Sequence, residues 1–284
     1  MLVDKPAAMT SHDVVQRVRR VLGTNAAGHT GTLDPFATGL LVVLVGRATR
    51  LARFVERQSK TYLATARLGI RTDTDDLTGQ VIKTSERGDL VTESQAKETL
   101  AGFLGTQLQR PPPYSAKHVG GERSYRKARR GEAVNLAEVS VTVDRIEMVE
   151  WLPPLVTFRA VVSSGTYMRA LARDLGERLA VGAHLTGLRR EAIGSLRVQD
   201  AVSLERLSAD ALVPARTVLG DLPTVELDLS SRLDAVHGRA VEENGEAGKR
   251  VSGTVVALLS AGQLVAVAMS EDGWLRPKVV LEEP

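Results

Sequence analysis

The sequence predicts a mixed α/β protein that ends in a small β-rich domain. Up to about residue 220, some segments repeat apolar residues at helical spacing, and others alternate apolar with polar residues as strands do. After Leu222 the chain changes to short strand-like runs separated by single glycines. We therefore expect one domain over residues 1–220 and a smaller β-rich domain over residues 221–284.

The first helix is predicted by its two ends as well as by its apolar face. Thr10 and Asp13 have the spacing of a capping box. Apolar residues then recur on one helical face from Val14 onward, and Gly23 ends the pattern.

The other elements are predicted by the same two periodicities. Helical spacing predicts helices over residues 48–55, 96–104 and 171–179. Alternating or short continuous apolar runs predict strands over residues 40–45, 62–68, 139–143, 157–160, 255–259, 264–269 and 278–281. Two segments are predicted to be loops, the glycine-rich residues 28–39 and the basic residues that follow the prolines at 111–113.

Composition excludes several classes of site. The chain has no cysteine, which removes disulfides, thiolate metal sites and thiol nucleophiles. Its five histidines are scattered, so we expect no metal. The longest apolar run has six residues, and a bilayer span needs about 20, so we expect a cytoplasmic protein without a membrane segment. A pI of about 9.3 is compatible with a polyanionic partner.

Residues 28–39 are the most informative segment. They contain three glycines, three threonines and one proline, which suit a rigid turn that approaches a ligand closely and do not suit a hydrophobic core. Asp34 lies near the centre of this segment, directly before Pro35. Composition alone leaves two interpretations open, a functional loop or a tight connector with a capping aspartate.

Residues 28–39 also resemble the signature G-H-x-G-x-L-D-P-x-A-x-G of the bacterial tRNA pseudouridine-55 synthase (TruB) family. Further segments resemble the other motifs of that family, in the same order along the chain. They are Asp4-Lys5-Pro6 with Thr10-Ser11, Lys60-Thr61-Tyr62, Arg71–Asp76 with Gly79, Pro112–Ala116, Gly165–Arg169, Asp174-Leu175-Gly176, Gly182-Ala183-His184 and Leu188-Arg189-Arg190. The resemblance covers about residues 2–195. It implies a pseudouridine synthase catalytic domain with a largely antiparallel central sheet, crossed by the active cleft.

The resemblance implies that the protein isomerises the uridine at position 55 in the T-loop of tRNA. This reaction breaks the N1–C1′ bond, turns the uracil and rejoins it through C5, so no cofactor is expected. It needs an ionised nucleophile in a water-poor pocket, and the resemblance assigns that role to Asp34. Arg169 matches the arginine that pairs with this aspartate and opposes its protonation. Asp76 is expected to join this network, with a simple turn carboxylate as the alternative.

Four more residues match positions that contact the substrate RNA. Tyr62 would stack on the target base, and Tyr167 and Leu188 match the other uridine-contacting positions. His29 matches a residue that holds the splayed loop by stacking or by phosphate contact. Without the resemblance, Tyr62 and Leu188 would be more typical of core packing, and a lone histidine is more often structural.

A basic insertion over about residues 110–135 is similar to the RNA-gripping insertion of the family. Its cations are expected to bind RNA phosphates and to become ordered on binding, although such clusters are usually only solvated surface. They are Arg123, Arg126, Lys127, Arg129 and Arg130. Arg189 and Arg190 are expected to add to the same surface.

The implied partner is the T-arm and elbow of tRNA, from which the target uridine must be flipped out of its stack. A monomer suffices for this reaction, and no protein partner is expected. The strands after Leu222 are compatible with a PUA-like RNA-binding domain, but no motif secures that assignment.

Other functions can be compared with this one. Uridine C5 methylation and zinc-dependent deamination both require cysteines, which the chain lacks. A tRNA-folding factor that acts by binding alone would need no nucleophile, so the presence of Asp34, Tyr62 and Arg169 favours an enzyme. A guide-RNA-dependent relative that acts on ribosomal RNA is less favoured, because the insertion is of the bacterial kind and the C-terminal region is short.

Overall fold

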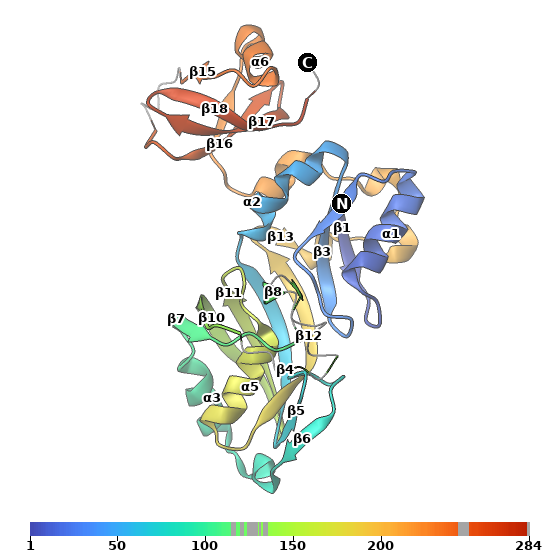
Figure 1. Cartoon of the computed structure of the whole chain (residues 1–284), viewed down its shortest axis with the longest axis vertical. Coiled ribbons are helices and arrows are strands. Elements are labelled where there is room, and N and C mark those ends of the chain that lie inside the picture. The colour runs from blue at the N-terminus through green and yellow to red at the C-terminus, as the bar shows by residue number, and fades with distance from the viewer. Residues whose placement is uncertain are drawn as a thin grey trace.

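The structure is a computed structural model, and it describes residues 1–114, 118–119, 122–123, 130, 132, 136–243 and 250–282. Within these ranges, no helix is both long and apolar enough to cross a bilayer. The fold is mixed α/β, as predicted, and its strands form one large sheet and a separate smaller one near the C-terminus (Figure 1).

Strands outnumber helices among the described elements. The helices are α1 (Ser11–Leu22), α2 (Ala52–Glu56), α3 (Glu93–Ala101), α5 (Met168–Arg178) and α6 (Leu229–Val236). The strands are β1 (Leu2–Lys5), β2 (Ala27–Thr30), β3 (Thr38–Val45), β4 (Lys60–Leu68), β5 (Ile70–Thr72), β6 (Val81–Thr84), β7 (Gly105–Gln109), β8 (His118–Val119), β9 (Glu122–Arg123), β10 (Val139–Leu152), β11 (Leu155–Val162), β12 (Ala183–Ile193), β13 (Leu196–Arg197), β14 (Thr224–Glu226), β15 (Val241–Glu242), β16 (Val255–Ser260), β17 (Gln263–Glu271) and β18 (Trp274–Val280).

The large sheet has nine strands in the order β1-β3-β12-β4-β11-β10-β7, with β2 paired to β3 and β13 paired to β12. All of its described pairs are antiparallel except β3 with β12. The predicted, largely antiparallel sheet is therefore confirmed. β4 lies in the middle, where Tyr62 pairs with Ala160 of β11 and with Arg190 of β12.

Helices α5 and α3 cover one face of this sheet (Figure 1). Because side chains alternate along a strand, Tyr62, Ala64 and Ala66 of β4 all point to that face. They pack in one apolar cluster with Leu171 and Leu175 of α5. The cluster also includes Leu33 and Ala37, on either side of Asp34, so the loop that carries Asp34 is anchored in the main core.

The smaller sheet has five strands in the order β14-β16-β17-β18-β15, and α6 packs against it. It lies at one end of an elongated molecule (Figure 1). An apolar cluster joins it to the first part of the chain, because Leu264 and Val267 of β17 pack with Leu51, with Val55 of α2 and with Val218.

The local signals at the N-terminus predicted the first helix correctly. The Thr10 side chain accepts a hydrogen bond from the Asp13 amide, and the Asp13 carboxylate accepts one from the Thr10 amide at 2.9 Å, which completes the capping box. Gly23 ends the helix with a φ of 61°.

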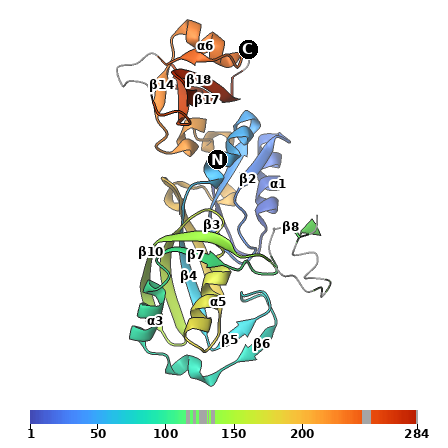
Figure 2. The same ribbon diagram turned by 60° about the vertical axis from the view of Figure 1, so that its left-hand side comes forward.

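Three predictions of secondary structure need correction. Residues 28–39 are not one loop, because β2 extends to Thr30 and β3 starts at Thr38. The helix predicted over residues 48–55 begins as a 3₁₀ turn over Gly46–Leu51 and continues as α2. The long strand β12 and the helix α6 were not predicted. Of the predicted basic loop, the structure describes the β8–β9 hairpin, which stands away from the body of the molecule (Figure 2).

Candidate active site

Asp34 lies in the turn between β2 and β3, and buried neighbours hold this turn at both ends. Leu33 is buried, and its backbone exchanges two hydrogen bonds with the Ser11 hydroxyl, with distances of 2.9 and 3.3 Å. Ala37 is buried as well, and its amide donates to the Asp34 carbonyl at 3.0 Å. These contacts fix the backbone of Asp34, whereas its side chain is 31% exposed and therefore open to a ligand on one side.

Arg169 of α5 grips the Asp34 carboxylate with two nitrogens. Its Nε lies 3.0 Å from Oδ2, and its Nη2 donates to Oδ1 at 3.2 Å. The side chain of Arg169 is only 7% exposed, and its remaining donors bind the carbonyls of Thr74 and Tyr114, at 3.0 and 2.9 Å. A guanidinium held at so many points presents a fixed positive charge to Asp34.

Asp76, expected either to join the network or to be a turn carboxylate, makes contacts of both kinds. Its Oδ2 lies 3.4 Å from Nη1 of Arg169. Its Oδ1 accepts hydrogen bonds from the hydroxyls of Thr74 and Thr78, at 2.8 and 2.6 Å, and from the Thr78 amide at 2.9 Å. Asp76 is buried, and both of its carboxylate oxygens have polar partners. This geometry fits a residue that orients Arg169.

Burial raises the pKa of Asp34 above its ordinary value. The Arg169 guanidinium opposes this rise, while the negative charge of Asp76 adds to it. The carboxylate thus loses part of its hydration but keeps a cation on both of its oxygens. A partly desolvated carboxylate of this kind is a stronger nucleophile than a fully hydrated one.

The three residues predicted to contact the target uridine belong to elements that pack next to the Asp34 turn or carry Arg169. Tyr62 is buried in the same apolar cluster as Leu33, and Leu188 is partly buried against that cluster. Tyr167 caps the N-terminus of α5, two residues before Arg169. Tyr62 and Leu188 are thus packing residues of the core that also anchors Leu33, and their contact with the uridine stays a prediction.

His29 lies in β2, outside the contacts that hold Asp34. Burial lowers its pKa, and the charge of Arg190 lowers it further. Its Nδ1 is buried without a hydrogen-bond partner among the described residues. A neutral imidazole is better suited to stacking than to a charged phosphate contact.

The predicted phosphate-binding cluster lies largely outside the described residues. This holds for Arg126, Lys127 and Arg129, and for Arg123 only the backbone, in β9, is described. Arg130 is exposed, and its Nε lies 2.6 Å from a carboxylate oxygen of Glu132. The grip on RNA therefore stays a prediction.

Arg190 is not on the RNA-binding surface, contrary to the prediction. Its side chain is buried, with Nε donating to the Leu40 carbonyl at 2.7 Å and Nη2 to the Gly31 carbonyl at 3.0 Å. It thus fixes both sides of the hairpin that carries Asp34. Arg189 remains partly exposed, but its guanidinium forms a two-point ion pair with Asp4, at 3.0 and 2.7 Å.

Lys5 is a further functional candidate whose role the sequence did not reveal, although it lies in the first motif. It is fully buried, and its Nζ donates to the carbonyls of Pro6, Met9 and Pro35, at 2.9, 2.7 and 3.3 Å. Burial lowers its pKa to about 8, while the negative charge of Asp34 acts in the opposite direction. Lys5 ties the residue after Asp34 to the N-terminal strand.

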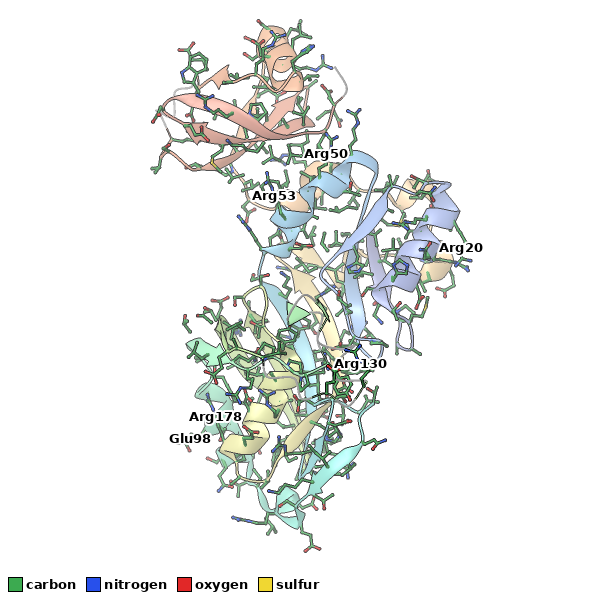
Figure 3. The ribbon with its side chains drawn as sticks, viewed as in Figure 1. Arg20, Arg50, Arg53, Glu98, Arg130 and Arg178 are labelled. Carbon is green, nitrogen blue, oxygen red and sulfur yellow. The ribbon has the colours of Figure 1, made fainter. Side chains whose placement is uncertain are left out.

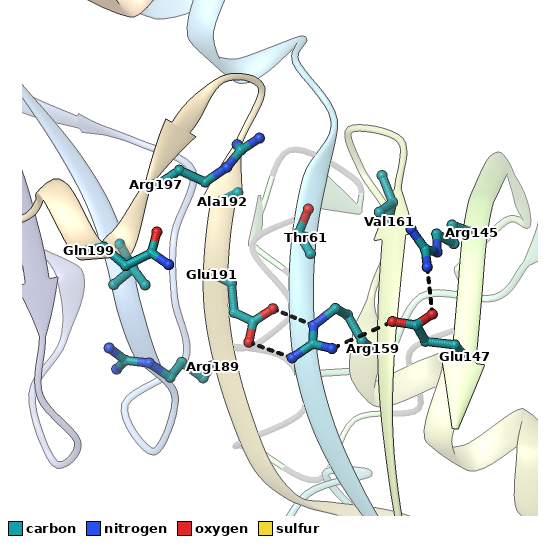
Figure 4. Close-up of a pocket in the computed structure, with 11 residues that line it drawn as sticks. Thr61, Arg145, Glu147, Arg159, Val161, Arg189, Glu191, Ala192, Arg197 and Gln199 are labelled. Atoms are coloured by element: carbon teal, nitrogen blue, oxygen red, sulfur yellow. Dashed lines mark hydrogen bonds and ion pairs between the residues drawn. The ribbon is translucent and has the colours of Figure 1, made fainter. Parts of the chain in front are cut away.

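A hollow of about 420 Å³ lies on the face of the sheet opposite α5 (Figure 4). Charged side chains cross it from strand to strand, with Arg159 bound by Glu191 at 2.7 Å and by Glu147 at 3.5 Å, and Arg145 bound by Glu147 at 2.7 Å. Of the residues with a predicted role, Arg189 lines it, whereas Asp34, Arg169 and Asp76 do not. Arg145, Arg159, Glu147 and Glu191 are paired with one another, Arg189 pairs with Asp4 outside the hollow, and we assign no chemistry to it.

Comparison with protein families gives two matches that together run along most of the chain. Residues 19–168 match the family described as TruB family pseudouridylate synthase (N terminal domain). Residues 169–223 match the family described as tRNA pseudouridylate synthase B C-terminal domain.

The chain is also similar over nearly its whole length to proteins named tRNA pseudouridine synthase B. It is 41% identical over 290 residues to tRNA pseudouridine synthase B of Thermobifida fusca (strain YX), covering 99% of this chain and 97% of that protein. It is 40% identical over 292 residues to tRNA pseudouridine synthase B of Arthrobacter sp. (strain FB24), covering 99% and 95%.

Solved structures share the fold. A Cbf5-Nop10-Gar1 complex aligns with a TM-score of 0.77 and 26% identity, covering 99% of this chain and 84% of that one. An H/ACA RNP bound to a substrate RNA that contains 2'-deoxyuridine aligns with a TM-score of 0.75 and 23% identity, covering 99% and 84%.

Proposed function

Because the chain belongs to the TruB family of pseudouridylate synthases and is an isomerase that converts uridine to pseudouridine in tRNA, we propose that its target is the uridine at position 55 in the T-loop. We further propose that Asp34 is the nucleophile. The observation that carries this assignment is the partly exposed Asp34 carboxylate, held at both oxygens by the buried Arg169. The folding-factor alternative gives no reason for such a carboxylate.

The proposed reaction rearranges one nucleotide. The Asp34 carboxylate attacks either the ribose or C6 of the base, and the N1–C1′ bond breaks. The detached uracil turns, a C5–C1′ bond forms, C5 gives up its proton and N1 gains one, so atoms and charge balance within the substrate and solvent. Asp34 leaves as the carboxylate, and no oxidant or group donor is consumed.

Each neighbouring residue has a definite part in this proposal. Arg169, oriented by Asp76, keeps Asp34 ionised although burial raises its pKa. The buried Tyr62 and the partly buried Leu188 provide an apolar surface beside the nucleophile that excludes water from the detached base. Tyr167, at the start of α5, is the third proposed contact to the uridine.

Access to a stacked uridine requires base flipping, at a cost of a few kcal/mol. Contacts between protein and RNA must offset this cost, and we assign part of that binding energy to stacking of the His29 ring on a base. The ring is neutral because the pKa of His29 is lowered. The cations Arg123, Arg126, Lys127, Arg129 and Arg130 are the proposed phosphate contacts to the T-arm and elbow. We propose that a monomer in the cytoplasm performs this reaction.

A tritium-release assay tests the proposal. tRNA carrying uridine tritiated at C5 is incubated with the wild type and with Asp34→Asn, without added cofactor. We expect release by the wild type only, and no release from a tRNA that carries cytidine at position 55. Release that does not depend on position 55 would move the target elsewhere. Tight tRNA binding without release by the wild type would instead support a folding factor.

A further inference from the structure

Two adjacent aspartates and two arginines one helical turn apart form a repeated arrangement beside the candidate site. Asp76 contacts Arg169, and Arg169 donates to the carbonyl of Tyr114 at 2.9 Å. Asp75 contacts Arg173 at 3.1 Å, and Arg173 donates to the carbonyl of Arg110 at 2.9 Å. Each aspartate thus orients one arginine of α5, and each arginine holds one carbonyl of residues 110–114.

Residues 110–114, which we call the stem, follow β7 directly and form the first part of the basic insertion. Two further hydrogen bonds join the stem region to α5, because the buried Gln109 side chain accepts from the Tyr167 amide at 2.8 Å and donates to the Tyr167 carbonyl at 3.2 Å. Pro111 and Pro112 are buried, which leaves few backbone conformations to the stem. One helix, α5, therefore carries Arg169 at the nucleophile and the contacts that position the insertion.

Arg173 is held as firmly as Arg169. Its side chain is 11% exposed, and its Nε donates to the carboxylate of Asp174 at 2.9 Å. The side chain of its other partner, Asp75, is 8% exposed, and the Asp75 carbonyl accepts from the Leu185 amide of β12 at 3.0 Å. The contact from Arg173 to the stem is thus anchored through Asp75 in the central sheet.

Packing is more open beside the stem than in the core. A cavity of about 530 Å³ lies there, lined among others by Asp75, Arg110, Pro111, Pro113 and Arg173. Polar contacts therefore contribute more to the position of the stem than they would at a close-packed site.

From this geometry we propose that Arg173 is a positioning residue. It fixes the stem of the basic insertion on α5, so that the insertion meets the RNA in register with Asp34, and Asp75 orients it. Arg173 touches neither the nucleophile nor the other residues assigned to the uridine, so its effect is expected on RNA binding and not on the chemical step. This inference rests on the proposed function of the insertion as an RNA grip.

The test compares Arg173→Met with the wild type, by steady-state tritium release and by filter binding of unmodified tRNA. Methionine keeps much of the side-chain volume but donates no hydrogen bond. The change also removes the hydrogen bonds of Arg173 to Asp75 and Asp174, but only its hydrogen bond to the Arg110 carbonyl holds the stem directly. Loss of one charge-assisted hydrogen bond corresponds to about a tenfold effect. We therefore expect KM and Kd to rise about tenfold, with kcat changed by less than about threefold.

Arg178→Met is the matched control on the same helix. Arg178 lies near Glu98 of α3 and away from Arg130 (Figure 3). It donates to the carbonyl of Gly102 at 2.9 Å and stacks on Phe103 at 3.7 Å, so it supports α5 without contacting the stem. We expect Arg178→Met to lower the melting temperature but to leave KM and Kd near the wild-type values.

Two further variants separate positioning from general damage to the fold. Asp75→Asn keeps the size of the side chain but removes its charge, and it should raise KM and Kd in the same direction as Arg173→Met, by a smaller factor. A variant with neutral residues in place of Arg126, Lys127, Arg129 and Arg130 already lacks four of the five cations of the grip. Adding Arg173→Met to that variant should change Kd by less than about threefold. Both changes act on Kd through the binding of the insertion to RNA, so their effects are not additive.

The inference is overturned if Arg173→Met lowers kcat at unchanged KM and Kd. It is also overturned if Arg173→Met and Arg178→Met shift Kd equally, or if the effect of Arg173→Met persists in full without the four cations. Failure of the proposed function is seen separately, as absence of tritium release by the wild type, and the Kd ratios still decide the role of Arg173 in that case.

Discussion

At the scale of single residues, the ionisation of Asp34 depends on Arg169. Burial raises the pKa of Asp34 and the guanidinium opposes the rise, so removing the guanidinium moves the pKa further up. A nucleophilic carboxylate must be ionised, and activity is therefore lost as the pH falls through its pKa. We predict that Arg169→Met lowers kcat/KM at neutral pH by at least about 100-fold and moves the acid limb of its pH profile to higher pH.

Tritium release at sub-saturating tRNA, followed from about pH 5 to about pH 9, measures this limb, because the pH dependence of kcat/KM reports the pKa values of the free enzyme. Arg169→Lys keeps a positive charge and should move the limb less than Arg169→Met does. An acid limb at the same pH in all three proteins would mean that a group other than Asp34 controls it.

Lys5 gives a prediction about stability. Its pKa is lowered from 10.5 to about 8 in the folded protein, so between these values the unfolded chain binds more protons than the folded one. The contribution of Lys5 to the free energy of unfolding therefore rises with pH across this window. Lys5→Met leaves three backbone carbonyls without their donor and should cost about 2–4 kcal/mol at pH 7.

Urea unfolding of both proteins at several pH values checks this prediction. The stability difference between wild type and Lys5→Met should widen as the pH rises from about 8 toward 10.5. A difference that stays constant would show that the Lys5 ammonium is not desolvated in the folded protein.

Some residues of the site could be predicted from the sequence, and others could not. Asp34, Arg169 and Asp76 could be predicted to form one network, because their motifs are matched by a family whose chemistry requires it. Arg190 was wrongly placed on the surface, because arginine is rarely buried and its two carbonyl partners, Leu40 and Gly31, are about 150 residues away in the sequence. Burial of such a residue is decided by tertiary contacts.

At the scale of elements, local signals predicted α1 and regular alternation predicted β4, but β12 was missed. Register shifts interrupt the pairing of β12 with β4 between Leu185 and Gly187 and again between Arg190 and Ala192. Each shift reverses the side that later side chains face, so the apolar pattern never alternates long enough to predict a strand. These irregularities can be seen only once the partner strand is known.

The junction of β3 with β12 gives a prediction for Gly39. This residue has a φ of 102° and pairs with Arg190, and a Cβ added to it would lie 2.8 Å from the Arg190 amide nitrogen. The contact is with backbone, so it cannot be relieved by a side-chain rotation. We predict that Gly39→Ala costs about 3 kcal/mol or more and lowers activity further by displacing the turn that carries Asp34.

Gly28→Ala is the control in the same hairpin, because a Cβ at Gly28 would meet nothing within 4 Å and its φ is not in the left-handed region. Guanidinium unfolding and tritium release of both variants make the comparison. Equal stability of Gly39→Ala and Gly28→Ala would contradict the close approach of β3 and β12.

At the scale of the whole molecule, the order of strands could not be predicted from periodicity. β12 lies between β3 and β4, although more than 100 residues separate it from either strand in the chain. This arrangement brings α5, which directly precedes β12, onto the sheet beside the turn of Asp34. The resemblance to a known family implied such a cleft, whereas the residue pattern alone gave only a mixed α/β class.

The proposed division into residues 1–220 and 221–284 does not imply that the two parts are independent. Leu259, Leu264 and Val279 of the C-terminal sheet share an apolar cluster with Leu51 and Val55. In addition, Arg50 donates to the Val280 carbonyl at 3.0 Å. Removing the C-terminal part exposes apolar surface on α2 and on the turn before it, and each buried aliphatic side chain is worth about 1.5–3 kcal/mol.

We therefore predict that a chain of residues 1–220 melts at least about 5 °C below the full chain, as calorimetry would measure. Arg50→Gln in the full chain serves as the control, because it removes the hydrogen bond but leaves the apolar cluster, and its shift should be much smaller. If the part-chain melted at the temperature of the full chain, the cluster would contribute nothing to stability, and the C-terminal sheet would be a tethered module. The lower melting temperature would instead mean that the sheet supports α2, which directly precedes the strand that carries Tyr62.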